Sequence, residues 1–207
     1  MNAATAGKVA VRAIDQSIAL NKLSAASYEN FTTNGVKATA EVMQMPQVQA
    51  LVREIQAGNA GISIQTAIKY AQDYIVSGST IPQASIATPG STLIKVVPKG
   101  DGISPYSGYW ISPQQAQAIA VMTPEKASQV LGLPATQAAR ISNSGIDFYA
   151  ITAKAGVTPN VFVSKIASTA QGAVIMPGGA QQVIVPNRSL WTQPIAVNPF
   201  NLSIGGR

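Results

Sequence analysis

The stretch that decides the fold runs from Asp147 to Arg188 and reads DFYAITAKAGVTPNVFVSKIASTAQGAVIMPGGAQQVIVPNR. Three runs in it are dense in β-branched or aromatic residues and are bounded by Gly, Pro or Asn, which is typical of β-strands. These runs are Phe148–Lys154, Val161–Ile166 and Gln182–Val185. We expect a sheet whose strand ends hold hydroxyl, amide and lysine side chains in a site. An edge hairpin closed by the Pro177-Gly178-Gly179 turn explains the same pattern equally well.

The chain before this stretch is mainly helical in pattern. Apolar residues recur at helical spacing between residues 3 and 78, with Pro46 in a first helical turn and Ser63 as an N-cap. A strand at Thr92–Val97 and three short helices between residues 114 and 140 follow. This order predicts an α+β protein, with a small N-terminal helical bundle before a domain whose helices pack on a mainly antiparallel sheet. Because Ser79–Gly90 is rich in hydroxyls and has two prolines, we expect a helical domain (1–80), a linker (81–90) and a catalytic domain (91–207).

Two residue types are missing from the 207 residues, since the chain has no cysteine and no histidine. Their absence excludes disulfides, thiol nucleophiles, zinc hydrolases, Ser-His-Asp triads and two-histidine ribonucleases. The carboxylates show no metal-binding spacing, so we expect no metal and no cofactor. Catalysis must then use Lys, Arg, Tyr, Ser, Thr, Asn, Gln or the few carboxylates.

Positive charge gathers in the second half of the chain. Residues 1–90 carry six Lys or Arg and five acids, whereas residues 91–207 carry eight and three. A basic half indicates a polyanionic partner such as nucleic acid, although solubility alone also accounts for such a balance.

A helical leader joined to a small basic α+β domain resembles the toxin tips of contact-dependent growth inhibition proteins, the large filamentous-haemagglutinin-like exoproteins. This resemblance implies that residues 1–80 serve to enter the target cytoplasm through an inner-membrane protein, and that residues 91–207 are the poison. It also implies a secreted or cell-surface location in the producer, action in the target-cell cytoplasm, and a cognate immunity protein. Because the C-terminal half is basic, we expect that immunity protein to be acidic.

Two toxin families fit residues 92–207. The barnase/EndoU/colicin/RelE group of ribonucleases is similar in fold and composition, and its resemblance implies metal-free cleavage of RNA, with tRNA, alone or with elongation factor Tu, as the expected substrate. The tuberculosis necrotizing toxin domain, which cleaves NAD, is similar in the order of four short motifs. These are Tyr109-Trp110-Ile111-Ser112-Pro113, Leu133-Pro134, Tyr149-Ala150-Ile151 and Pro177-Gly178-Gly179-Ala180-Gln181-Gln182. Gln182 then takes the position of that family's catalytic glutamine, while Lys95 is the nearest cation to a first-strand arginine that this chain lacks.

Candidate residues follow from the chemistry of RNA cleavage without histidine, in which a cation stabilises the charged phosphate and a second group moves a proton. The expected catalytic residues are Lys95, Lys154, Lys165, Ser168, Thr169 and Gln182. The expected substrate-binding residues are Tyr106, Tyr109, Trp110, Arg140 and Arg188. Solvated lysines and core aromatics are the ordinary alternative for each.

The sequence therefore predicts an antibacterial ribonuclease toxin. A NAD glycohydrolase toxin is the alternative, and a non-enzymatic binding module is a third reading that suits the low charge and abundant Ala and Gln.

Overall fold

The helices of the first half form where their capping residues predict. The computed structural model describes residues 31–202, with α2 (Ala40–Gln44), α3 (Pro46–Gly58) and α4 (Ile64–Val76) in its N-terminal part. Thr39 and Ser63 cap α2 and α4 by accepting backbone N–H groups, and Pro46 opens α3. Of the helical pattern expected between residues 3 and 78, residues 3–30 lie outside the described residues, and Phe31–Thr33 form strand β1.

Strands from both halves of the chain build three antiparallel sheets. One has the order β2 (Gln83–Ile86), β6 (Asn160–Lys165), β9 (Gln181–Ile184) and β4 (Tyr109–Trp110). The second has the order β10 (Ile195–Ala196), β5 (Ile146–Thr152) and β3 (Thr92–Pro98). A bridge between Ile94 and Ile111 joins the two sheets. The four strands expected from the sequence are all present, and the predicted α+β class is confirmed.

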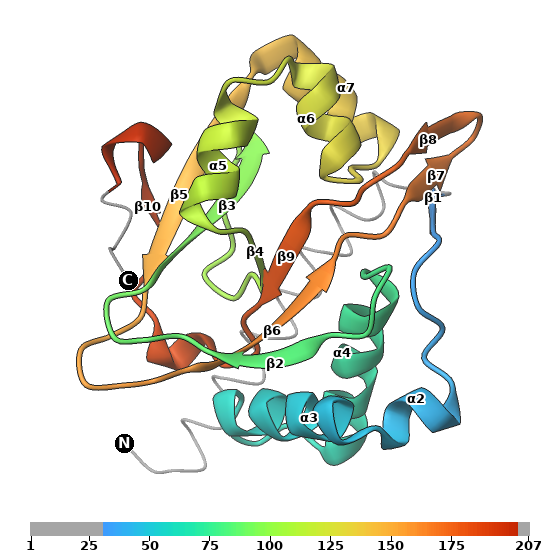
Figure 1. Cartoon of the computed structure of the whole chain (residues 1–207), viewed down its shortest axis with the longest axis vertical. Helices are drawn as coiled ribbons and strands as arrows, with labels where there is room; N and C mark the ends of the chain where they lie inside the picture. Colours follow the sequence, from blue (N-terminus) through green and yellow to red (C-terminus); the bar gives the residue numbers. More distant parts are fainter. Residues whose placement is uncertain (1–30, 203–207) are drawn as a thin grey trace.

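Alternation along the strands divides the core into three hydrophobic clusters. Two of these strands, β6 and β9, lie above α3 in Figure 1. Phe162 and Ile184 face α3 and α4, whereas Val161 and Val183 face the second sheet. The other face of that sheet is covered by α5 (Pro113–Ala120), α6 (Pro124–Val130) and α7 (Ala135–Ser144). Because successive side chains point to opposite faces of a strand, the same strands serve two clusters at once.

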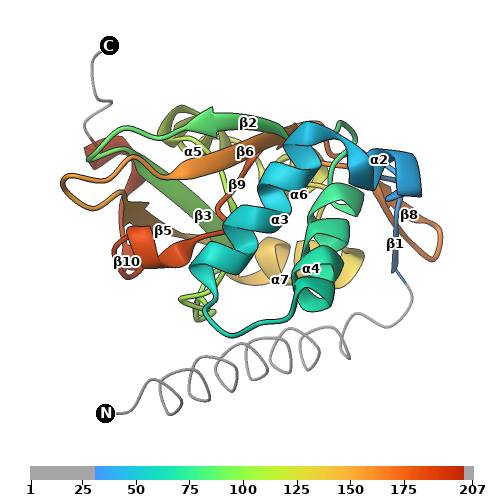
Figure 2. The same ribbon diagram turned by 90° about the horizontal axis from the view of Figure 1, so that it is seen from below.

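The segment expected as a linker contains a strand. β2 pairs with β6 over four positions, from Gln83 opposite Val163 to Ile86 opposite Asn160. Seen from below, α3 and α4 lie in front of the strands (Figure 2), and they share one cluster with Phe162 and Ile184. Residues 83–86 of the segment expected as a linker (81–90) thus form a strand paired with β6. The division into functional domains stays a prediction.

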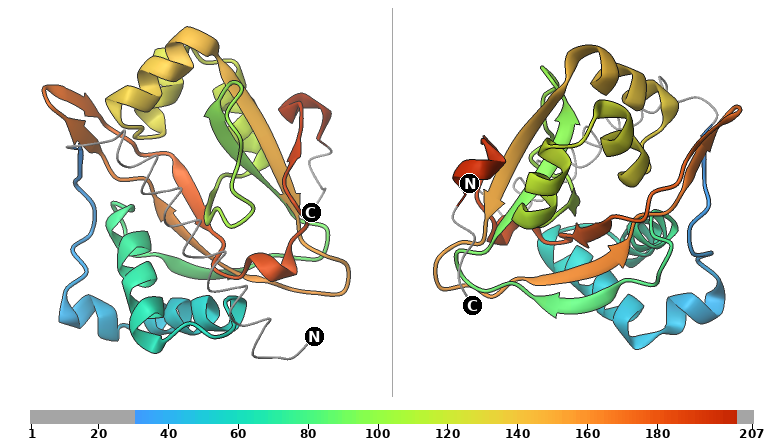
Figure 3. Two further views of the ribbon diagram at one scale, coloured as in Figure 1. Left: turned by 180° about the vertical axis from the view of Figure 1, so that it is seen from behind. Right: turned by 45° about the horizontal axis from the view of Figure 1, so that its top comes forward.

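A long hairpin leaves the body of the protein. β7 (Thr169–Gln171) and β8 (Val174–Met176) form it, and β1 pairs with β7 on the other side. Figure 3 shows from two further directions that the hairpin extends away from the rest, with β1 beside it. The polar segment 168–172 thus includes strand β7, which the sequence did not predict. No helix within residues 31–202 has the length and apolar character needed to cross a bilayer.

Candidate functional site

A pocket of about 470 Å³ lies where the two halves of the chain meet. Its walls come from β1, the C-terminal end of α4, strands β3, β4 and β9, the loop that follows β6, and the α6–α7 turn. Its polar side chains belong to Thr33, Gln72, Asp73, Ser77, Lys95, Tyr109, Trp110, Thr169 and Gln182. Five of the eleven residues predicted for the site are in this set, so the structure brings together Lys95, Tyr109, Trp110, Thr169 and Gln182.

Gln182 is held rigidly at the pocket wall. Strand alternation exposes Gln181 and buries Gln182, which is 4% exposed. The Gln182 Nε2 group donates to Ser77 Oγ at 3.0 Å and to Ser164 Oγ at 2.9 Å. Both amide protons are therefore engaged, and the amide oxygen is left to receive a hydrogen bond from a bound molecule.

Lys95 is the ammonium of the pocket. Its Nζ donates to the Tyr109 carbonyl oxygen at 3.2 Å and lies 5.8 Å from the centroid of the Tyr109 ring. Removal from water disfavours the charged form and lowers the pKa of Lys95 to about 8. The ion pair within residues 31–202 joins Arg140 to Asp101, so the described carboxylates leave Lys95 without a counter-ion. A desolvated cation without a counter-ion favours the binding of an anion.

Aromatic side chains of β4 form another wall. Trp110 is 1% exposed, and its Nε1 donates to the Ser107 carbonyl oxygen at 2.8 Å. Tyr109 packs edge-on against Tyr74 with ring centroids 5.2 Å apart, and burial raises the pKa of its hydroxyl to about 12. Tyr109 is therefore a neutral hydrogen-bonding group at neutral pH.

Thr169 has a structural role in the pocket wall. Its hydroxyl donates to the Gly132 carbonyl oxygen at 2.6 Å, and its side chain is 5% exposed. Gly132 has φ +56°, and a Cβ there would lie 2.6 Å from the Ala167 carbonyl oxygen. The α6–α7 turn thus needs glycine at this point to approach the strands.

The other predicted site residues lie outside the pocket. Lys154 donates to the Ser189 carbonyl oxygen, Lys165 is exposed on β6, and Ser168 accepts from Asn34 Nδ2. Tyr106 is 47% exposed in the loop before β4. The structure therefore disperses the lysine and hydroxyl groups on which the RNA-cleavage prediction depends.

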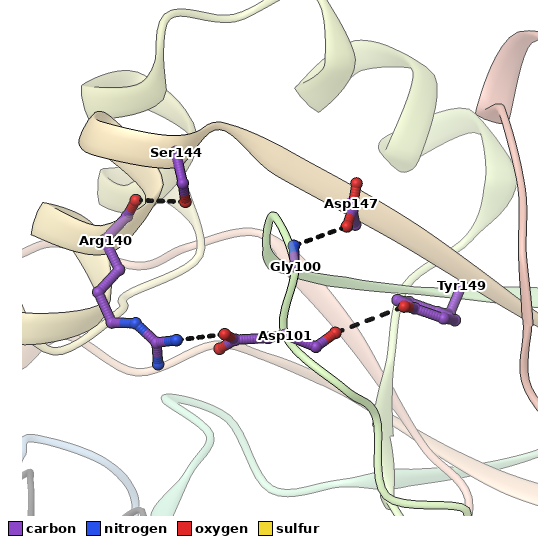
Figure 4. A network of polar contacts seen from close by, with 6 residues as sticks. All are labelled: Gly100, Asp101, Arg140, Ser144, Asp147 and Tyr149. Carbon is purple, nitrogen blue, oxygen red and sulfur yellow. Dashed lines mark hydrogen bonds and ion pairs between the residues drawn. The ribbon is translucent and has the colours of Figure 1, made fainter.

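Arg140 serves a surface network (Figure 4). Its guanidinium pairs with Asp101, while Tyr149 Oη donates to the Asp101 carbonyl oxygen and the Gly100 N–H donates to Asp147. These contacts hold the loop after β3 against α7 and β5. Arg140 thus stabilises a loop, at a position that does not line the pocket.

Arg188 supports Trp110 from outside the pocket. Its Nε donates to the Pro105 carbonyl oxygen and one terminal nitrogen donates to the Thr192 carbonyl oxygen, each at 3.0 Å. The guanidinium carbon lies 5.3 Å from the Trp110 ring centroid, and partial burial lowers the pKa of Arg188 to about 10. Arg188 therefore contacts the site indirectly, by packing against the Trp110 ring.

Sequence reasoning missed Asp73 of α4 and Ser77, the residue that caps the C-terminal end of α4. Residues four apart on a helix lie on one face, and Ser77 Oγ accepts from Gln182. Nothing in the local pattern distinguishes these two from solvated helix residues. In residues 31–202 no cluster of Asp, Glu, His or Cys is arranged to bind a metal ion.

Comparison with known proteins finds structural matches alone. No protein-family model matches the chain, and no curated protein matches it. One similar solved structure is Rhs1-CT in complex with its cognate immunity protein RhsI1, at 14% identity and a TM-score of 0.41, over 63% of this chain and 90% of that one. Another is Tse6 in complex with Tsi6, at 16% identity and a TM-score of 0.36, over 73% of this chain and 98% of that one.

Proposed function

We propose that this protein is an antibacterial toxin that hydrolyses NAD to nicotinamide and ADP-ribose. One observation carries the proposal, which is that motifs far apart in the sequence line one pocket. Tyr109-Trp110-Ile111, Leu133-Pro134 and Gln182 all line it. They come from three of the four motifs that resemble the NAD-cleaving tuberculosis necrotizing toxin domain. The fourth motif lies on β5, with Tyr149 opposite Lys95 of β3.

The size and lining of the pocket favour a small molecule over a polynucleotide. Small-molecule sites span roughly 300–1,000 Å³ and are mostly apolar, with a few placed polar groups, and this pocket holds about 470 Å³. A polynucleotide needs a row of cations along its backbone. The pocket wall offers one ammonium, Lys95, while Lys154 and Lys165 lie elsewhere. This difference favours NAD hydrolysis over the tRNA cleavage expected from composition.

Each polar group has a role in this reading. Lys95 neutralises the diphosphate as a point charge, where the resembling family uses an arginine. Tyr109, which is half-buried, offers aromatic surface to the nicotinamide ring, and the buried Trp110 backs the same wall. The Gln182 amide oxygen accepts a hydrogen bond from a ribose hydroxyl or from the attacking water. Its fixed orientation lets it act without reorganisation during the reaction.

The test incubates the purified chain with NAD and, separately, with total tRNA. We expect NAD to be consumed and tRNA to stay intact. Gln182→Ala should lower turnover by about 10²–10³-fold, on the scale of losing one preorganised polar group. Gln181→Ala is the matched control, because Gln181 is exposed on the same strand, and it should keep full activity. Cleavage of tRNA with NAD untouched would overturn the proposal in favour of the nuclease.

The pH dependence of substrate binding tests Lys95 separately. An ammonium with a pKa of about 8 attracts the diphosphate below that pH and loses its charge above it. The KM for NAD should therefore stay constant up to pH 7 and rise above pH 8. Lys95→Arg keeps its charge, so its KM should stay level to pH 9. A KM that is level in both proteins would contradict the role of Lys95.

The biological setting belongs to the same proposal. We expect delivery from the surface of a producing cell, action in the cytoplasm of the target, and neutralisation by a cognate acidic immunity protein. The excess of Lys and Arg in residues 91–207 supports an acidic partner.

A further inference from the structure

A carboxylate residue of the pocket wall comes from the helical part of the chain. Asp73 lies on α4, and it is the one carboxylate among the residues that line the pocket. It sits one helical turn before Ser77, whose hydroxyl accepts from Gln182. Since residues four apart share a helix face, Asp73 and Ser77 point toward the same cavity.

A contact from the opposite wall brings Asp73 close to the aromatic side of the pocket. Tyr109 Oη donates to the Asp73 carbonyl oxygen at 3.4 Å and also interacts with the Ser77 side chain. Lys95 contacts the carbonyl oxygen and the ring of the same Tyr109. Tyr109 thus contacts the backbone of Asp73 and the ammonium of Lys95, and all three residues line the same pocket.

The Asp73 carboxylate is partly withdrawn from water. This desolvation raises its pKa, and Lys69, one turn earlier on the same helix, lowers it in part. The titratable groups facing Asp73 are Lys69 and Tyr74 on α4 and Tyr109 on β4. A raised pKa makes this carboxylate a better proton acceptor than an ordinary surface aspartate.

We propose that Asp73 is a catalytic carboxylate that stabilises the ribosyl cation and receives the proton of the attacking water. This inference rests on the proposed NAD hydrolysis. As the C1′–N bond breaks, its electron pair goes to the nicotinamide nitrogen, which becomes neutral, and C1′ becomes cationic. The water oxygen then bonds to C1′, and its proton passes to Asp73 and on to solvent. Glycosidic cleavage in general uses carboxylates in these two ways.

The proposal is tested by steady-state NAD hydrolysis with the full chain. Asp73→Asn keeps the shape and removes the charge, so kcat should fall by about 10²–10⁴-fold with KM changed by less than about 3-fold. Asp73→Glu should restore part of kcat. Glu41→Gln removes another carboxylate of the helical region that does not line the pocket, and it should match the wild type.

The pH profile adds a readout that a merely structural role would not move. The wild-type kcat should fall at acidic pH as Asp73 is protonated, from a pH above the ordinary range for aspartate, and Asp73→Asn should lack this limb. A kcat for Asp73→Asn within about 3-fold of wild type, while Gln182→Ala is inactive, would overturn the role of Asp73 alone. If the wild type leaves NAD intact, the proposed function fails and this inference fails with it. Thermal unfolding verifies that each variant is folded. If Asp73→Asn does not fold, Asp73→Ser takes its place in the same measurements.

Discussion

The helices of the first half and the strands of the second contribute different things to one pocket. Helix α4 brings the exposed Asp73 and, at its C-terminal cap, the half-buried Ser77. The strands bring Lys95 and Gln182, whose side chains are withdrawn from water. One region supplies an accessible carboxylate and the other supplies polar groups fixed inside a core. The pocket needs both sets of residues, so neither region forms the site on its own.

The same two regions also share a core. Val48, Leu51, Val52 and Ile55 of α3 belong to one cluster with Phe162 and Ile184. A helix buries its apolar stripe against whatever surface is available, and here that surface is a sheet. Separate helical and catalytic folding units would leave Phe162 and Ile184 uncovered. Four substitutions test what each region contributes to the core and to the pocket, and the one with the largest expected effect comes first.

Leu51→Ala should reduce the free energy of unfolding by about 2–5 kcal/mol, because Leu51 is 0% exposed and the cavity lies under the sheet. Both tryptophans, Trp110 and Trp191, lie in the strand region. The denaturation midpoint from tryptophan fluorescence should therefore shift as far as the midpoint from circular dichroism. Gln65→Ala, on an exposed position of α4, is the control. A fluorescence midpoint that stays in place would show that the regions unfold independently.

Ser77→Ala should lower NAD turnover by about 10–100-fold, equivalent to about 1.4–2.7 kcal/mol in the barrier. It removes one of the two hydroxyls that hold the Gln182 amide, and Ser164 alone fixes the orientation less well. Ser79→Ala removes an exposed hydroxyl two residues further on and should have no effect. Equal NAD turnover by the two variants would contradict a role of the Ser77 hydroxyl in orienting Gln182.

Lys95→Met should raise the stability of the protein and also raise the KM for NAD. Burial lowers the pKa of Lys95 from 10.5 to about 8, so the charged form destabilises the fold at neutral pH. We expect a gain of about 1–2 kcal/mol, because part of the side chain keeps contact with water. The folded state binds fewer protons between pH 8 and 10.5, so wild-type stability rises across that range and the gain shrinks. A gain that is constant with pH would rule out this cause.

Arg140→Ala should have the smallest effect. Its ion pair with Asp101 is exposed, with side chains 55% and 25% accessible, and such pairs contribute below about 1 kcal/mol. The KM for NAD should stay within about 2-fold of wild type, because Arg140 does not line the pocket. A large rise in KM would return Arg140 to the substrate-binding role expected from the sequence.

The sequence predicted the parts of the fold that carry local patterns. Ser63 as an N-cap and Pro46 in a first turn placed their helices, and β-branched runs placed β3, β5, β6 and β9. Short strands were missed because their order comes from distant partners. Gln83–Ile86 is polar and exposed, and only its pairing with β6 makes it a strand. The three residues of β7 likewise depend on β1 and β8.

Prediction of the site was uneven for a related reason. Gln182 and Trp110 could be chosen from motif order, since their neighbours in sequence carry the resemblance. The sequence predicts Lys154 and Lys165 as site residues because each ends or lies in a β-branched run, yet β6 turns Lys165 to the surface. Asp73 reaches the pocket only through packing of α4 on the strands. Side-chain direction and tertiary contacts decide which residues line a pocket, and the local sequence specifies neither.

The pairing of β1 with β7 determines when the pocket can form during folding. Asn34 Nδ2 donates to Ser168 Oγ across 134 residues of sequence, and Phe31 and Thr33 of β1 line the cavity. During synthesis β1 leaves the ribosome early and has no partner until the β7–β8 hairpin emerges. Contacts so distant in sequence form slowly because a long loop must close first. The cavity is thus among the last features to be completed as the chain folds.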